Sequence, residues 1–202
     1  MILTPIARQD LPAALDRFAR GLGAASPRAA FCLIRATAPD RAAGAIAEGH
    51  RHAALALARD CGMRVHPPEV PSPFNWDGAA LNGASDAYVI LHEIAHFLLA
   101  PPGRRGLVEF GLGPGPDTVD RAGAERAAIL SPLARDEDEA AASLLGILWE
   151  ARLAQPALAS FLDQNRLEGL DRSAAAHFAG VLGELERRGL LPPLSSGRGG
   201  GD

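Results

Sequence analysis

The chain has little cysteine, few aromatic residues and no excess of basic charge. Only Cys32 and Cys61 occur among the 202 residues, and they lack the CxxC spacing of a zinc ribbon or a redox motif. We therefore expect two reduced, mostly buried thiols and no disulfide. The formal net charge of -4 argues against a nucleic-acid groove, which needs basic side chains in excess to bind phosphates.

Long hydrophobic runs are missing as well. Every apolar run is interrupted well before the roughly 18 residues that a membrane-spanning helix needs. The first residues, MILTPIARQD, show no basic leader followed by an apolar run and a cleavage site, so we expect no signal peptide. These absences predict a cytoplasmic protein with no membrane partner and no direct nucleic-acid partner.

Length and composition favour one folded domain with a real core. Of the 202 residues, 48% are hydrophobic, which is ordinary for a globular protein. We predict a single domain over residues 1–192, best specified over 85–190, and a disordered tail over 193–202 that is rich in glycine and serine. The predicted fold class is mostly α (α+β), with a small sheet.

Helical spacing of apolar residues, together with caps and breakers, predicts most elements. A strand is expected at AAFCLIRA, residues 29–36, because it is short and apolar. Proline and glycine predict irregular chain over residues 65–83 and 111–117. Helices are expected over residues 10–22, 41–60, 85–100, 136–154, 156–166 and 173–188.

The helix predicted over residues 85–100 contains the segment YVILHEIAHFLLA. It is apolar on nearly every side, which is typical of a buried helix, yet it carries His92, Glu93 and His96. Residues four apart lie on one helix face, so His92 and His96 project together. Buried imidazoles and carboxylates are costly unless something binds them. The H-E-x-x-H spacing therefore predicts a divalent metal held by both histidines, with Glu93 able to act on a bound water.

A catalytic metal site usually has three protein ligands and an open position, so a third ligand is needed. His177 on the last predicted helix is one candidate, although an ordinary helix histidine is the simpler interpretation. His50, His52 and His66 precede the motif in less defined surroundings, where surface positions are the simpler interpretation.

Four acids, DEDE at residues 136–139, begin the next strong helix. Negative charge is favourable at a helix N-terminus, which would account for Asp136 and for other members of the run. Glu137 and Asp138 lie nearer a leucine-bearing face. Glu139 shares its face with three small residues, Ala142, Ser143 and Gly146. Periodicity leaves the choice among the acids open, but small residues allow a close approach to the histidine helix, which favours Glu139.

Four stretches of the chain resemble the bacterial elongation factor P hydroxylase family. They are LHEIAHFLLAPPGRRGLVEFG, GPD, DEDEAA and LASFLDQNRLEG, and they fall between Ala87 and Arg188. The most specific is RRGLVEFG, residues 104–111, because H-E-x-x-H is shared by many metalloproteins. Where the family has the aromatic segment FGYWYCPDG, this chain has FGLGPGPDT, and its N-terminal third shows little likeness. These departures leave the substrate open.

The resemblance implies a zincin-like metalloprotein domain that acts as an oxygen-dependent hydroxylase of a protein lysine side chain. Its non-haem metal would be held by His92, His96 and Glu139, with Fe²⁺ favoured and Zn²⁺ as the alternative. The partner would be a protein substrate such as a translation factor. The sequence sets no expectation for the oligomeric state.

Two other interpretations stay open. Small intracellular zinc peptidases share an H-E-x-x-H helix that is followed by a helix beginning EA-x-x-x-x-LL. In that chemistry zinc polarises a carbonyl and Glu93 is the general base. With Fe²⁺ the same three ligands form a facial triad, and Glu93 assists from outside the coordination sphere. The third interpretation is a non-catalytic metal-binding module.

Residues near the motif provide further candidates. Arg104 and Arg105 follow the histidine helix and are candidate substrate-binding residues under the hydroxylase interpretation, and Tyr88 lies near the stripe that carries the histidines. Glu109 is a further candidate ligand. Its neighbours predict a short strand, on which Glu109 would occupy an exposed alternate position.

Overall fold

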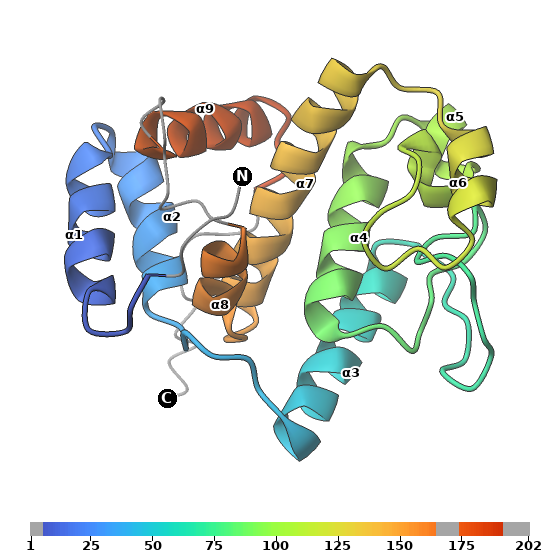
Figure 1. Ribbon diagram of the computed structural model, residues 1–202, viewed down its shortest axis with the longest axis horizontal. Coiled ribbons are helices and arrows are strands. Elements are labelled where there is room, and N and C mark those ends of the chain that lie inside the picture. Colours follow the sequence, from blue (N-terminus) through green and yellow to red (C-terminus); the bar gives the residue numbers. More distant parts are fainter. Residues whose placement is uncertain (1–5, 165–173, 192–202) are drawn as a thin grey trace, which may run out of the picture. The chain divides into compact units, whose positions relative to one another are not determined.

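The computed structural model describes residues 6–164 and 174–191. These residues are mostly helical, as predicted (Figure 1). The predicted tail over 193–202 lies outside the described residues. The elements are α1 (Leu11–Gly21), α2 (Ala25–Arg35), α3 (Gly44–Asp60), α4 (Ala87–Leu99), α5 (Pro102–Arg105), η1 (Val108–Gly111), α6 (Arg121–Ala127), α7 (Pro132–Arg152), α8 (Ala157–Asp163) and α9 (Ala174–Arg187).

The chain divides into two compact units. The first comprises residues 1–41 and 147–202, and the second comprises residues 42–146. The division falls within α7, whose residues up to Gly146 belong to the second unit. His177 lies in the first unit, and all the other candidate ligands lie in the second. No helix among the described residues is both long and apolar enough to cross a membrane.

The core of the first unit is a cluster of four phenylalanines, one from each of α1, α2, α8 and α9. Their ring centroids lie 4.7–6.4 Å apart, mostly in tilted or edge-on contacts. Such contacts favour aromatic pairs beyond simple burial of area. The cluster consists of Phe18, Phe31, Phe161 and Phe178.

The strand predicted over residues 29–36 is wrong, because this segment is helical and belongs to α2. Ala30, Phe31 and Ile34 are buried at helical spacing. A short apolar run does not distinguish a strand from a buried helix by periodicity alone. Cys32 lies on the other side of α2 and is exposed, and Cys61 is half-buried. Both thiols are free as predicted, but the prediction that they are mostly buried is wrong for Cys32.

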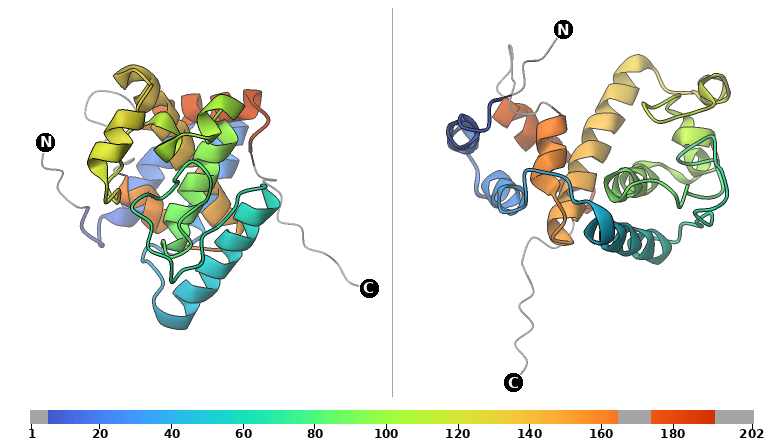
Figure 2. Two further views of the ribbon diagram at one scale, coloured as in Figure 1. Left: turned by 90° about the vertical axis from the view of Figure 1, so that its right-hand side faces the viewer. Right: turned by 60° about the horizontal axis from the view of Figure 1, so that its bottom comes forward.

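In the second unit α3 packs against α4, and the views of Figure 2 show the same two helices side by side. The proline-rich segment between them is irregular, as predicted. The predicted small sheet is not found in the described ranges, which contain only isolated bridges from Leu81 to Val65 and Trp76. The backbone N–H groups of His66 and Leu81 still form hydrogen bonds that hold this segment together.

Helix α7 begins one turn before the predicted start. Ser131 accepts a hydrogen bond from the backbone N–H of Ala134, and Pro132 occupies the first helical position, where its missing N–H costs nothing. The acids at 136–139 consequently lie beyond the first turn, which contains no acidic residue. A favourable interaction with the helix dipole therefore does not explain them, since that interaction fades after the first turn.

Glu150 provides a test of this fold that is separate from the metal ligands. Its side chain is buried in the first unit with Arg41 3.6 Å away, and burial raises its pKa to about 7 despite the hydrogen bond with Ser160. The folded state thus holds a proton that the unfolded state loses above about pH 4.5. Stability should fall between pH 4.5 and 7, by about 3 kcal/mol in all.

We expect Glu150→Gln to remove that loss. The variant should be about 3 kcal/mol more stable than wild type at pH 8 and nearly equal to it at pH 4. Urea unfolding at both pH values measures the difference, with the exposed Glu186→Gln as the control. An equal difference at both pH values would contradict the assignment.

Candidate metal centre

Helix α4 presents His92 and His96 on one face because the two residues are four apart. Their Nε2 atoms lie 3.0 Å apart, and the two rings meet edge to face with centroids 4.5 Å apart. His96 is buried, with 2% of its surface exposed, whereas 27% of the His92 side chain is exposed. His92 is therefore the member of the pair that lies nearer the solvent.

Helix α7 brings Glu139 to the same point. Its Oε2 atom lies 3.3 Å from His92 Nε2 and 3.5 Å from His96 Nε2. A methyl group added at Gly146 would lie only 3.3 Å from the backbone of His92, so the missing side chain lets α7 lie close to α4 at this residue. The structure thus brings Glu139 to the histidines, and Gly146 belongs to the small-residue face that was predicted to allow this.

The three atoms have the spacing of ligands to one metal ion. Their separations of 3.0, 3.3 and 3.5 Å form a nearly regular triangle. Bonds of about 2.1 Å place neighbouring ligands about 3.0 Å apart in octahedral geometry and about 3.4 Å apart in tetrahedral geometry. The cluster of His92, His96 and Glu139 could therefore hold a divalent metal with little movement.

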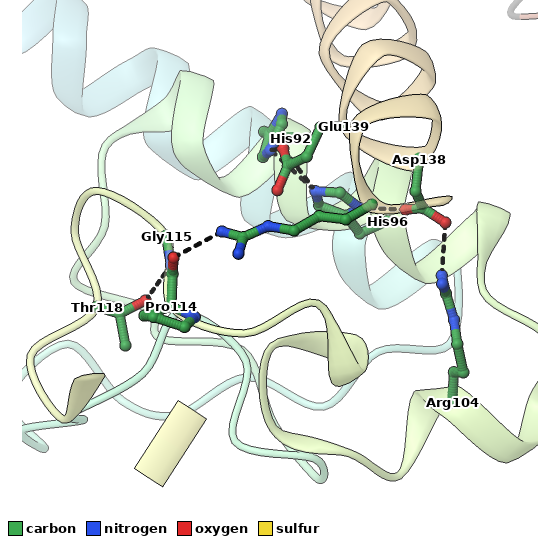
Figure 3. A network of polar contacts seen from close by, with 9 residues as sticks. His92, His96, Arg104, Pro114, Gly115, Thr118, Asp138 and Glu139 are labelled. Atoms are coloured by element: carbon green, nitrogen blue, oxygen red, sulfur yellow. Dashed lines mark hydrogen bonds and ion pairs between the residues drawn. The ribbon is translucent and has the colours of Figure 1, made fainter. Parts of the chain in front are cut away.

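Asp138 and Arg104 form a row of hydrogen bonds that ends on His96. Because a carboxylate only accepts, His96 donates its Nδ1 proton to Asp138 Oδ1 at 2.9 Å. Nε2 is therefore the nitrogen of His96 that can bind a metal. Arg104 Nη2 donates to the other oxygen of Asp138 at 2.7 Å. Figure 3 shows the resulting row from Arg104 through Asp138 to His96. The row fixes the orientation of the imidazole.

Burial and charge act on the two imidazoles in opposite directions. Burial and the neighbouring His96 lower the pKa of His92. Burial would also lower the pKa of His96, but the hydrogen bonds with Asp138 and Glu139 outweigh it and raise this pKa to about 10. Burial would raise the pKa of Glu139, but the hydrogen bonds and charges of the two histidines outweigh it and lower this pKa. Without a metal, the cluster thus holds a proton that a metal must displace.

Glu93 lies on α4 directly after His92 and is buried, with 5% of its surface exposed. Burial raises its pKa to about 8, helped by the charges of Glu109, Glu139 and Asp117 and opposed by His96. No side chain or backbone group in the described ranges forms a hydrogen bond with this carboxyl group. Its oxygens are therefore available to a water or a substrate.

Element η1 lies beside His96 and forms a wall of the site. Glu109 and Phe110 have positive φ angles of 44° and 52°, which are unusual for residues other than glycine and concentrate at functional sites. Glu109 Oε1 accepts from the Asn75 backbone N–H at 3.1 Å and from Thr118 Oγ1 at 2.9 Å. The predicted exposed strand is therefore wrong, since Glu109 is buried in a turn.

An aromatic ring of η1 packs against His96, the more buried of the two histidines. The Phe110 ring stacks on His96 with centroids 5.8 Å apart. Trp76 stacks on Phe110 with centroids 5.3 Å apart. Sequence reasoning missed Asn75, Trp76 and Thr118, because nothing in a proline-rich loop indicates which of its residues return to the site.

The other candidate residues have different surroundings. Arg105 donates to the carbonyl of Ala100 at 3.0 Å and lies over the Phe97 ring at 4.5 Å. Arg104 is buried against Asp138. Tyr88 is half-buried, one helical turn before His92. Of the candidate ligands, eight do not belong to the cluster: His50, His52, His66, His177, Glu109, Asp136, Glu137 and Asp138.

Asp138→Asn tests the supporting row. The amide can still accept from His96, but it is neutral and no longer pairs with Arg104. We expect the metal affinity to fall about tenfold to a hundredfold, as is usual when a partner of a ligating histidine is lost. Titration of apo-protein against a competing chelator measures the affinity. Exposed Glu137→Gln is the control, and equal affinities in the two variants would contradict a role for Asp138.

Comparison with family models, with curated proteins and with solved structures finds no match for this chain.

Proposed function

We propose that the chain is a metal-dependent enzyme in which His92, His96 and Glu139 hold one divalent ion. We further propose that the reaction is an oxygen-dependent hydroxylation of a protein side chain, with iron as the metal. The observation that carries the proposal is the triangle of ligand atoms, with sides of 3.0, 3.3 and 3.5 Å. Two histidines and one carboxylate with open positions are typical of non-haem iron oxygenases.

The position of the RRGLVEFG segment also supports this proposal. This segment carries the most specific resemblance to elongation factor P hydroxylases. Arg104 at its start binds Asp138, which orients His96. Phe110 near its end stacks on the same His96 ring. One residue of the segment therefore contacts the candidate ligand directly and another binds the carboxylate that orients it, as expected if they serve the same centre.

Hydroxylation replaces a hydrogen on carbon by OH, using one atom of O₂. The second oxygen atom leaves as water after it takes two protons, together with two electrons from an electron donor. A bound ferrous ion would supply the binding and reduction of O₂. Glu93 can carry a proton at its free carboxyl oxygens, and Asp138 holds His96 in the required tautomer. The apolar Phe110 ring stacks on His96, and Trp76 stacks on Phe110.

The position of Glu93 favours a second candidate, a zinc-dependent peptidase. The carboxyl group follows a ligating histidine directly, is buried, and forms no hydrogen bond with the described part of the chain. A general base that activates water needs this freedom to reach the substrate. A non-catalytic metal-binding module would have no need of such a group.

The test loads the apo-protein separately with Fe²⁺ and Zn²⁺. Iron-loaded protein, O₂ and an electron donor should add one oxygen atom to a lysine of a bacterial translation factor, as seen by mass spectrometry. The same mixture without O₂ is the control. Peptide cleavage by the zinc form alone would favour the peptidase. Metal binding without either activity, across protein and peptide substrates, would favour the binding module.

A further inference from the structure

Arg135 is the cationic side chain on the face of α7 that carries Glu139. The two residues are four apart, so their side chains extend to the same side of the helix. Arg135 is half-buried, and its Nη2 atom donates to the carbonyl oxygen of Pro114 at 2.9 Å. The guanidinium group thus reaches from the ligand-bearing helix to the loop at 111–118.

That loop is connected to the wall of the metal centre. The backbone N–H of Gly115 donates to Thr118 Oγ1 at 2.9 Å, and Thr118 in turn donates to Glu109. Glu109 precedes Phe110, whose ring covers His96. Figure 3 shows Pro114, Gly115 and Thr118 together on the loop to one side of the histidine cluster. Arg135 therefore lies between the ligand-bearing helix and a wall of the same centre.

Arg135 forms no ion pair with any carboxylate of the described ranges, unlike Arg104, which pairs with Asp138. A guanidinium has five N–H donors in a planar fork, and the bond to Pro114 uses one of them. A half-buried cation with unused donors, next to a candidate metal, is suited to binding an anion.

The surroundings favour a singly charged, planar anion. A methyl group at Gly113 would lie 3.5 Å from Arg135 Nη1 and 3.6 Å from Glu125 Oε2. Both groups therefore flank Gly113, and the carboxylate of Glu125 repels a doubly charged phosphate more than a carboxylate. One guanidinium also fits a single carboxylate with two parallel hydrogen bonds.

We propose that Arg135 binds a carboxylate group of the substrate and so positions the substrate at the metal centre. This inference rests on the proposed function, because it assumes that substrate is bound beside the three ligands. It adds a substrate class, namely molecules or protein segments with a carboxylate near the reacting group. Arg135 is a specificity-determining residue in this scheme.

The test uses acetate as the probe and metal-free, ¹⁵N-labelled protein at constant ionic strength. The amide signals of Gly113 and Gly115 should move saturably with acetate and stay fixed with neutral acetamide. Arg135→Gln should weaken acetate binding at least about tenfold, as expected for a lost charged hydrogen bond. Arg135→Lys keeps the charge and a donor for Pro114 without the planar fork, and should bind with intermediate affinity.

Arg121 provides a matched control. Its Nη1 atom donates to the carbonyl of Gly115 at 2.8 Å, so it contacts the same loop, but it is exposed and lies on α6. Arg121→Gln should bind acetate within about twofold of wild type, because exposed charges are screened by water and salt. Equal losses in Arg121→Gln and Arg135→Gln, or none in Arg135→Gln, would overturn the proposal. Tighter binding of phosphate than of acetate would overturn the carboxylate assignment.

The same titration in His92→Ala/His96→Ala separates this inference from the proposed function. Acetate binding that survives there depends on Arg135 and not on the histidines. Wild-type protein that binds acetate through Arg135 but no metal would refute the metal centre alone. Wild-type protein that binds metal but no acetate would refute the role of Arg135 alone.

Discussion

His96→Ala is expected to lower the affinity for a divalent metal by about a hundredfold to a thousandfold and to abolish activity. Structural zinc sites with four ligands bind with roughly 10–16 kcal/mol, so each ligand contributes about 3 kcal/mol or more. His96 is the most buried of the three ligands and is held by Asp138 at 2.9 Å. Titration of apo-protein with Zn²⁺ or Fe²⁺ against a competing chelator measures the loss.

Two further variants keep this prediction testable. His52→Ala is the matched control, because His52 is exposed on α3 and its Nε2 atom lies 3.1 Å from Glu48 Oε1; its metal affinity should equal that of wild type. His92→Ala removes a more exposed ligand and should lower the affinity comparably with a smaller loss of stability. Circular dichroism establishes that each variant is folded. Wild-type affinity in folded His96→Ala and His92→Ala would contradict the ligand assignment.

Glu93→Gln should separate the chemistry of the centre from metal binding. Glutamine has the shape of glutamate but cannot accept a proton, so a reaction that depends on Glu93 as general base should slow by about 10²–10⁴-fold. The metal content should stay unchanged, because Glu93 is not among the three ligands. Under the proposed hydroxylase reaction, the oxygen-dependent mass gain should persist in part, since Glu93 carries only a proton there.

Metal content and turnover must be measured on the same preparation of Glu93→Gln, with exposed Glu137→Gln as the control. A loss of peptide cleavage with full metal content would move the proposal to the zinc peptidase. An oxygen-dependent reaction that persists at a lower rate would support the hydroxylase. Loss of the metal itself would contradict the assignment of Glu93 as a residue outside the coordination sphere.

Residues that depend on helical periodicity could be predicted from the sequence. His92 and His96 lie together because they are four apart on a strongly apolar helix, and α4 was predicted to within two residues at each end. Glu139 could be favoured because it shares a face of α7 with Gly146, where an added methyl group would lie only 3.3 Å from the backbone of His92. Local rules of helix geometry were sufficient for these three residues.

Residues that depend on loop geometry could not be predicted. Glu109 is buried because two consecutive residues take positive φ, which no side chain at those positions indicates. Asp138 was one of three acids that periodicity could not separate, since adjacent helix positions differ by about 100° and two of them can flank one contact. Asp138 binds Nδ1 of His96, whereas Glu139 lies next to Nε2 of the same ring.

The expected strand failed for a related reason. The segment AAFCLIRA is apolar at positions that suit either a strand or a helix, and its length did not decide between them. Contacts with the phenylalanines of α1, α8 and α9 make the helical form favourable. Tertiary packing of this kind is not encoded in the segment itself.

The most direct test of the metal centre is elemental analysis of protein purified without oxygen. The proposal predicts about one equivalent of metal in wild type, with iron predominant, and almost none in folded His92→Ala/His96→Ala. If the protein holds only zinc even after attempted reconstitution with Fe²⁺, the assignment of the metal centre would stand and the proposed reaction would change. Wild-type protein that takes up no metal on reconstitution, or a double variant that binds as much as wild type, would contradict the central claim.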